Sequence, residues 1–267
     1  MRALQAADLA PPVSRTDGFV RRFPAVAHGV AGALLYGIVV TAFGLAATPS
    51  AFVVARLAPP LLHAHAWWQW PALGVLAGAA AFLWGFSLLA VVPVFNALLP
   101  TRIRPYSGGY FATAAIPWYL HNGLFYLVRF TVLPFVTMTP IGTLFLRAMG
   151  MRMGRRPRIT TELLSDVRLI TLGDDVTLGG SATIFCHYGG NGRLVIAPVV
   201  IGDRATVGEK ATVMGDVVIG EGATVMPHAV VLPRTRIGPR ERWGGAPARR
   251  ISHDEWEATK AEIGISR

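Results

Sequence analysis

The sequence predicts a chain of two parts, an apolar α-helical hairpin of the membrane type followed by an all-β solenoid. Three observations support this fold class. Residues 23–55 and 57–101 contain no Asp, Glu, Lys or Arg. Thirteen of the fifteen acidic residues lie at Glu162 or later, and none lies between Asp17 and Glu162. From Ile201 onward, an aliphatic residue recurs at every sixth position.

Both charge-free stretches exceed the roughly 20 residues that an α-helix needs to cross a bilayer. They predict transmembrane helices near residues 32–56 and 72–97, joined by a loop rich in proline and tryptophan. Arginines gather before the first helix and after the second, so both ends of the hairpin should be cytoplasmic, in a bacterial inner membrane. The expected divisions are a cytoplasmic N-terminal segment over 1–30, the hairpin over 31–100, and interfacial or broken helices over 101–150.

Residues 110–135 are apolar and aromatic, but Pro117, Gly123, Arg129 and Pro134 interrupt them. A third transmembrane span and a set of broken helices in the cytoplasmic interface are both compatible with this composition. The interruptions favour broken helices, because Arg129 would then reach the headgroups.

The net charge of +10 raises the question of nucleic-acid binding. The excess sits largely on arginines that flank apolar segments, and no basic stripe with interleaved aromatic residues lies outside the membrane half. We therefore expect a lipid bilayer, and no nucleic acid, as partner. The single cysteine, Cys186, rules out an internal disulfide, and the N-terminus lacks the pattern of a cleaved signal peptide.

The second half is built on a six-residue repeat. A helix would repeat every 3.6 residues and a paired strand every two, so period six indicates short strands joined by tight turns. Three such units make one triangular coil, with one aliphatic side chain per strand inside a prism. Glycines suit the turns, where positive φ or crowding excludes a side chain. The inward positions are Ile201, Val207, Val213, Ile219, Val225, Val231 and Ile237. Arg204, Lys210 and His228 should face outward.

These residues resemble the hexapeptide-repeat family of acyltransferases, whose coils form a left-handed parallel β-helix. The resemblance covers about residues 160–250 and includes "WGGAPARRI" (243–251), which is similar to that family's closing motif. "TPIGTLFLRAMGMRMGRR" (139–156) looks, more loosely, like the membrane-anchored C-terminal units of poly-lysine synthetase-like nonribosomal peptide synthetases. The implied divisions are a left-handed β-helix acyltransferase domain over 151–250 and a C-terminal helix or tail over 251–267.

The repeat is interrupted at "CHYGGNG" (186–192). If Val195 resumes the inward strip, about five residues are extra, and they should leave the prism surface as a loop. The family carries its catalytic histidine in such a loop, which implies that His187 is the general base. Imidazole titrates near neutral pH, as a base for a hydroxyl or amine must. The alternative is an ordinary solvent-exposed loop histidine.

Further site residues accompany His187. The unhindered N–H groups of Gly189, Gly190 or Gly192 are candidate donors to a tetrahedral oxyanion. Asn191 stands where the poly-lysine-type units carry acidic residues, so the acceptor stays open between a hydroxyl and an amine.

The closing motif supplies the candidate contacts for the donor, which are Trp243, Gly245, Ala246 and Arg249. Trp243 either stacks on an adenine or caps the open end of the prism. Arg249 either binds a phosphate or is solvated. Cys186 is either a packing residue, which its solitude favours, or an acyl-accepting nucleophile.

The predicted function is an integral membrane acyltransferase. It would move an acyl or aminoacyl group from an acyl-CoA or acyl-carrier-protein thioester to a hydroxyl or amine, with no metal. The resemblance also implies a homotrimer, and a carrier protein is a further candidate partner. Two alternatives remain, which are a non-catalytic membrane scaffold of a biosynthetic complex and a zinc-dependent enzyme of the carbonic anhydrase type. The zinc enzyme would need His187, His228 and His253 to converge.

Overall fold

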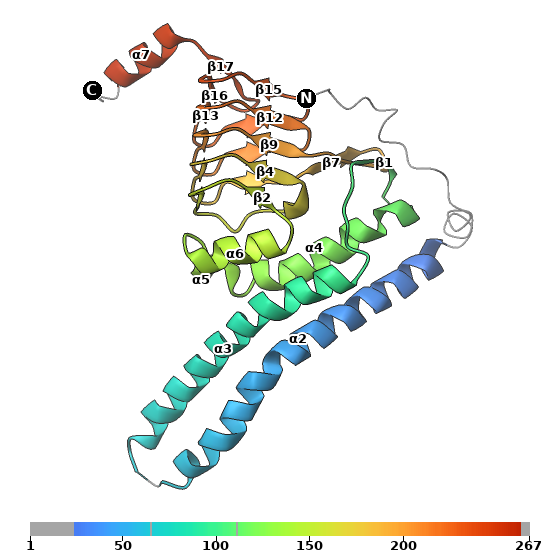
Figure 1. Ribbon diagram of the computed structural model, residues 1–267, viewed down its shortest axis with the longest axis vertical. Coiled ribbons are helices and arrows are strands. Elements are labelled where there is room, and N and C mark those ends of the chain that lie inside the picture. Colours follow the sequence, from blue (N-terminus) through green and yellow to red (C-terminus); the bar gives the residue numbers. More distant parts are fainter. Residues whose placement is uncertain (1–23, 65, 111, 263–267) are drawn as a thin grey trace. The chain divides into compact units, whose positions relative to one another are not determined.

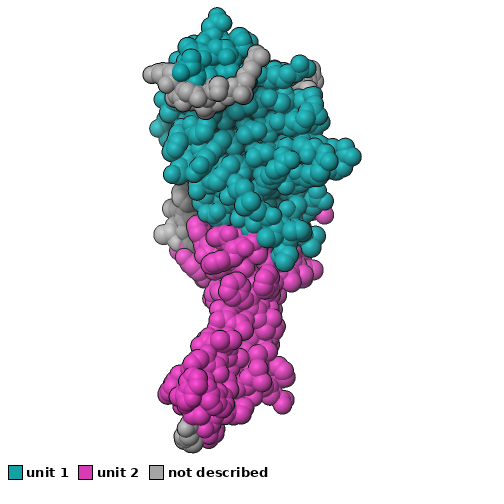
Figure 2. All heavy atoms as spheres, turned by 90° about the vertical axis from the view of Figure 1, so that its left-hand side faces the viewer, with its two compact units in different colours: residues 1–12, 103–115, 137–267 teal, residues 13–102, 116–136 magenta. Residues whose placement is uncertain are grey.

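The computed structural model describes residues 24–64, 66–110 and 112–262, which fall into two compact units. A helical unit comprises residues 13–102 and 116–136, and a solenoid unit comprises 1–12, 103–115 and 137–267. Figure 2 shows the two units in different colours. The segment predicted as one interfacial stretch, 101–150, is therefore divided between the units.

The helical unit is dominated by two long helices, α2 (Pro24–Leu62) and α3 (Gln69–Leu98). They form the predicted hairpin (Figure 1) and extend beyond the expected bounds of 32–56 and 72–97. The hydroxyl of Ser50 donates a hydrogen bond across the pair to the carbonyl of Ala80, at 2.7 Å. By length and composition both helices could cross a bilayer. Insertion itself stays a prediction.

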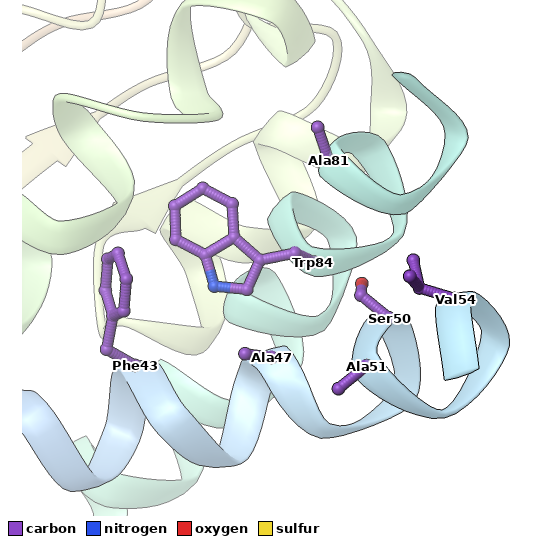
Figure 3. A pocket seen from close by; sticks show the side chains of 7 residues that line it. All are labelled: Phe43, Ala47, Ser50, Ala51, Val54, Ala81 and Trp84. Carbon is purple, nitrogen blue, oxygen red and sulfur yellow. The ribbon is translucent and has the colours of Figure 1, made fainter. Parts of the chain in front are cut away.

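An open apolar groove lies between α2 and α3. Phe43 and Trp84 meet edge to face in it, with ring centroids 4.6 Å apart (Figure 3). The rest of its lining consists of small or aliphatic side chains and one hydroxyl, from Ala47, Ser50, Ala51, Val54 and Ala81. The hydroxyl among them is that of Ser50, which is engaged with the Ala80 carbonyl.

The rest of the helical unit is broken, as the interruptions predicted. Helix α4 (Ile116–Arg129) is followed by the single turn α5 (Leu133–Val136). The fourteen residues of α4 span about 21 Å, less than the roughly 30 Å hydrocarbon core of a bilayer, so α4 is too short for a third span. His121 of α4 is buried and shares a 2.8 Å hydrogen bond with Asn96 of α3. The interfacial position of α4 stays a prediction.

The solenoid unit is a parallel β-solenoid with three faces (Figure 1). One face has the strand order β2-β4-β9-β12-β15, the second β3-β5-β10-β13-β16-β17, and the third β6-β11-β14. All neighbours pair in parallel except β16 and β17. The strands are β2 (Arg152–Met153), β3 (Arg158–Ile159), β4 (Ile170–Leu172), β5 (Thr177–Leu178), β6 (Thr183–Ile184), β9 (Val199–Ile201), β10 (Thr206–Val207), β11 (Thr212–Val213), β12 (Val217–Ile219), β13 (Thr224–Val225), β14 (Val230–Val231), β15 (Arg236–Ile237), β16 (Arg242–Gly244) and β17 (Arg249–Ile251).

The core of the solenoid confirms the predicted repeat frame. On each face the inward aliphatic side chains stack in register, as Ile184, Val213 and Val231 do on the third face. All seven predicted inward residues are buried, and Arg204, Lys210 and His228 are exposed. The small residues four positions later, such as Ala205 and Ala211, are buried as well.

The turns of the solenoid distinguish the two reasons for glycine. A Cβ on Gly202 would lie 2.8 Å from the backbone nitrogen of Glu221 in the next coil, so crowding excludes a side chain there. Positive φ values fall instead on turn residues two positions further along, where Gly222 (63°) is a glycine and the residues named next are not. Their φ angles lie between 55° and 67° at Arg204, Lys210, Asp216, His228, Arg234 and Arg240.

One helix precedes the solenoid and another follows it. Helix α6 (Pro140–Ala148) begins after Thr139, whose hydroxyl accepts a hydrogen bond from the N–H of Gly142, and it covers the first coil (Figure 1). Helix α7 (His253–Glu262) follows β17, which makes the predicted C-terminal helix or tail a helix.

Candidate active site

One coil of the solenoid is longer than the others, and it contains His187. Inward residues of the first face lie 18 positions apart from Ile201 to Ile219, but 29 apart from Leu172 to Ile201. The insertion is therefore eleven residues and not about five. The sequence led us to expect that Val195 resumes the inward strip, and this was wrong, because Val195 belongs to the inserted segment. Ile201 resumes the strip instead.

The insertion is a β-hairpin rather than a loop. Strand β7 (His187–Gly190) pairs antiparallel with β8 (Arg193–Ile196) around a two-residue turn. Asn191 and Gly192 have φ values of 50° and 74°, as the two central residues of a type I′ turn require. At its base, the N–H of Ala197 donates to the carbonyl of Cys186 at 2.8 Å.

A third strand comes from a distant part of the sequence. Strand β1 (Tyr106–Gly109) pairs antiparallel with β8, which gives a three-stranded sheet in the order β1-β8-β7. The guanidinium of Arg193 donates to the hydroxyl of Ser107 at 3.3 Å. The segment before the solenoid therefore holds the hairpin that carries His187.

His187 is held by a buried carboxylate. Its Nδ1 lies 2.6 Å from Oδ2 of Asp166, which is 0% exposed, whereas the His187 side chain is 26% exposed. The same Oδ2 accepts a hydrogen bond from the backbone N–H of Cys186 at 3.0 Å. Asp166 has a φ of 55° and lies just before the short helix η3 (Val167–Leu169). A carboxylate on Nδ1 fixes the ring and leaves Nε2 as the basic nitrogen, which is the arrangement of a general base.

Aromatic side chains line the same region. His187 and Gly189 lie on one face of β7, because residues two apart in a strand share a face. A Cβ on Gly189 would collide with the hydroxyl of Tyr110, so the Tyr110 ring lies against this glycine. The ring of Phe185 lies 5.4 Å from that of His187. Tyr110 therefore lies on the same face of β7 as the His187 side chain.

The backbone of β7 offers a donor at the sheet edge. Gly190 and Arg193 flank the two-residue turn, so they form a hydrogen-bonded pair, and Gly189 and Leu194 form the following non-hydrogen-bonded pair. The N–H of Gly189 therefore points away from β8, at the edge of this sheet. This geometry favours Gly189 over Gly190 as an oxyanion donor, while Asn191 lies in the turn.

Cys186 fits the packing interpretation. It is buried, and that burial, with a further contribution from the Asp166 carboxylate, raises the pKa of its thiol well above the usual range. The thiol is protonated at neutral pH and is no nucleophile there.

The remaining sequence-predicted residues lie elsewhere on the solenoid. His228 occupies an exposed turn. Trp243 continues the inward stack of Val207 and Val225 at the C-terminal end, and its indole N–H donates to Glu241 at 2.9 Å, which fits the capping interpretation. Gly245 and Ala246 form the exposed turn between β16 and β17, and Arg249 pairs with Glu255 at 3.0 Å.

The comparisons with known proteins give distant likenesses. No family model and no curated protein sequence matches the chain. One similar solved structure is a maltose O-acetyltransferase from Clostridium difficile 630, at 18% identity and a TM-score of 0.41, with 55% of this chain and 92% of that chain covered. Another is a hexapeptide-repeat-containing acetyltransferase from Vibrio cholerae complexed with acetyl coenzyme A, at 18% identity and a TM-score of 0.37, with 45% and 82% covered.

A galactoside acetyltransferase in complex with coenzyme A is similar at 17% identity and a TM-score of 0.37, with 47% of this chain and 78% of that chain covered. Scores this low carry no conclusion about the activity of this chain. The site therefore has to be argued from its own residues.

Two residues of the site were not found from the sequence, Asp166 and Tyr110. Asp166 lies 21 positions before His187, where no period-six position marks it. Tyr110 lies in an apolar stretch that predicts helices. The hairpin itself did carry a signal, since Asn-Gly between two short runs is typical of a type I′ turn.

Proposed function

We propose that this protein is an acyltransferase with His187 as general base and Asp166 as the residue that orients it. The single observation that carries the proposal is the 2.6 Å contact between His187 Nδ1 and the buried Asp166 carboxylate, at the coil that carries the eleven-residue insertion. A structural loop histidine has no need of a buried carboxylate, which is costly to desolvate.

The proposed reaction is attack of a hydroxyl or amine on a thioester. Nε2 of His187 takes the proton of the acceptor as the new bond to the thioester carbonyl forms. The N–H of Gly189 stabilises the resulting oxyanion. Collapse of the tetrahedral intermediate breaks the C–S bond, and the proton held by His187 goes to the departing thiolate. The products are an ester or amide and a free thiol.

The proposed donor is acyl-CoA, with an acyl-carrier-protein thioester as the alternative. The closing motif, with Trp243, Gly245, Ala246 and Arg249, is the proposed region of donor contact. It lies three strands beyond β5 along the second face, which is about 14 Å at the usual strand spacing. Both donors carry the thioester on an extended pantetheine arm, which can cover such a separation.

The acyl group and the acceptor follow from the sequence resemblance alone. The loose likeness to poly-lysine synthetase-like units extends the proposal to aminoacyl groups. Asn191 in place of their acidic residues favours neither a hydroxyl nor an amine.

The proposed setting is the inner membrane of a bacterium, with α2 and α3 inserted and the solenoid on the cytoplasmic side. Their length and apolar composition support this, as do the arginines at both ends of the hairpin. We also propose a homotrimer, in which each site lies between two subunits. Native mass spectrometry in mild detergent tests the trimer, and a fully active monomer would exclude it.

The decisive experiment measures thiol release from acetyl-CoA and longer acyl-CoA with a panel of hydroxyl and amine acceptors. His187→Ala should lose about 10²- to 10⁴-fold in turnover, the usual contribution of a general base. His228→Ala is the matched control, since His228 is an exposed histidine of the same unit. Near-wild-type turnover in His187→Ala would refute the assignment.

The same assay addresses the alternatives. A non-catalytic scaffold would release no thiol from any donor, including carrier-protein thioesters. For a zinc enzyme the geometry offers little, because no three His, Cys, Asp or Glu side chains gather as metal ligands within 24–64, 66–110 and 112–262. Zinc analysis of the purified protein tests that alternative independently.

A further inference from the structure

The helix that closes the N-terminal end of the solenoid is apolar on both sides. Its inner side buries Phe145, Leu146 and Met149 against the first coil. Its outer side exposes Ile141 and Leu144, at 46% and 69%. Met138, which precedes the N-cap residue Thr139, is 77% exposed. A helix that only sealed a solenoid against water would place polar residues outside.

The opposite end of the same solenoid provides the comparison. Helix α7 exposes Asp254, Glu255 and Glu257 and carries few apolar side chains. Helix α7 projects away from the strands (Figure 1) and is polar, as expected for contact with water, whereas the outer side of α6 is apolar. The difference calls for a specific environment at α6.

The charges of α6 and the first coil indicate the nature of that environment. Five exposed arginines belong to α6 or to the first coil that it covers: Arg147, Arg152, Arg155, Arg156 and Arg158. Asp174 and Asp175 pair with two of these arginines, at 2.7 Å each. The guanidinium of Arg147 donates to the backbone carbonyl of Gly154, and because a carbonyl is uncharged, this contact leaves the positive charge of Arg147 in place. The sequence between Asp17 and Glu162 adds no acidic residue.

We propose that the outer side of α6 lies in the interface of an anionic phospholipid bilayer. Met138, Ile141 and Leu144 would enter the boundary between headgroups and acyl chains, and the arginines of the first coil would contact lipid phosphates. Exposed apolar side chains next to a cluster of arginines are the usual composition of an interfacial helix. This contact is made by the solenoid unit itself, and it depends neither on catalysis nor on insertion of α2 and α3.

The test places a spin label on the full-length protein in nanodiscs of phosphatidylcholine with 30% phosphatidylglycerol. Leu144→Cys and Ile141→Cys carry the label in turn, and Glu209→Cys on an exposed turn is the control. Cys186 stays in place, because it is buried and should not react. Accessibility to oxygen, which partitions into lipid, is compared with accessibility to a water-soluble nickel chelate.

Labels at 141 and 144 should collide more often with oxygen than with the chelate, and the label at 209 should show the opposite. In discs of phosphatidylcholine alone, chelate access at 144 should rise at least about twofold, since the arginines lose their phosphate-rich partner. Chelate access at 144 equal to that at 209 in the anionic discs would overturn the proposal. So would exclusion of both reagents, which would show that protein covers this face. None of these outcomes depends on acyl transfer.

Discussion

Asp166→Asn is the substitution that isolates the proposed catalytic pair. The amide keeps the shape of the carboxyl group. It also keeps an oxygen that can accept from the N–H of Cys186, which lies 3.0 Å from Oδ2 of Asp166 in the wild-type protein. What it removes is the negative charge beside the imidazole, 2.6 Å from Nδ1. The folded structure should therefore persist while the imidazolium formed during proton transfer loses its partner.

The expected loss follows from the strength of that contact. A hydrogen bond to a charged group contributes about 1.5–3 kcal/mol, and each 1.36 kcal/mol of barrier is about tenfold in rate. Asp166→Asn should thus lower kcat by about 10- to 150-fold, with a smaller effect on KM. Thiol release under saturating donor and acceptor measures it, with circular dichroism as the control for folding.

A double variant sharpens this test. If Asp166 acts only through His187, then adding Asp166→Asn to His187→Ala should cost almost nothing further, because residues that act as a unit are not additive. Wild-type kcat in the folded Asp166→Asn variant, or full additivity in the double variant, would refute the reasoning.

Three other predictions follow from the geometry. Val213→Asp places a carboxylate between Ile184 and Val231 in a fully buried stack and should cost several kcal/mol, visible as loss of the β signal at lower urea concentration. Gly189→Ala should strongly reduce turnover, because its Cβ would collide with Tyr110 and lie 2.6 Å from the Arg193 carbonyl oxygen. Gly190→Ala is the control and should behave like wild type, because a Cβ there has open space. Equal activity of the two variants would contradict the packing described. Hydrogen bonds from Arg155, first of all from its backbone N–H, and from the Arg156 guanidinium lower the pKa values of Asp174 and Asp175. Their stabilisation is complete above the unfolded carboxyl value of about 4 and is lost as pH falls through the folded values. The Asp174→Asn, Asp175→Asn double variant should accordingly show a flatter dependence of the urea midpoint on pH below about 4, and an unchanged slope would count against these pairs.

The repeat made the solenoid predictable, because each six-residue unit contacts only its neighbours in the coils before and after it. Local pattern was then enough to place Val213 and Val225 inside and Lys210 outside. The same logic failed within the inserted segment, where Val195 is aliphatic but pairs in a hairpin.

The partners of His187 depend on contacts that a periodic pattern does not encode. Asp166 reaches the histidine because the preceding coil is offset, with Leu164 bridging to Ile184 across 20 positions instead of 18. Strand β1 pairs with β8 across about 90 positions of sequence. Only the folded chain brings these segments together.

The coil count of the solenoid fixes the height of the site above each end of the prism. Strands in one face are about 4.8 Å apart. The hairpin projects from the prism after β6, in the second coil, and β11 and β14 follow β6 on the same face. His187 therefore stands only about one strand spacing above the first coil, which α6 covers. If that end rests on lipid, the reacting atoms lie within reach of a headgroup or of a substrate held at the membrane surface. The solenoid would then act as a spacer, whose length in coils decides how far from the bilayer chemistry takes place.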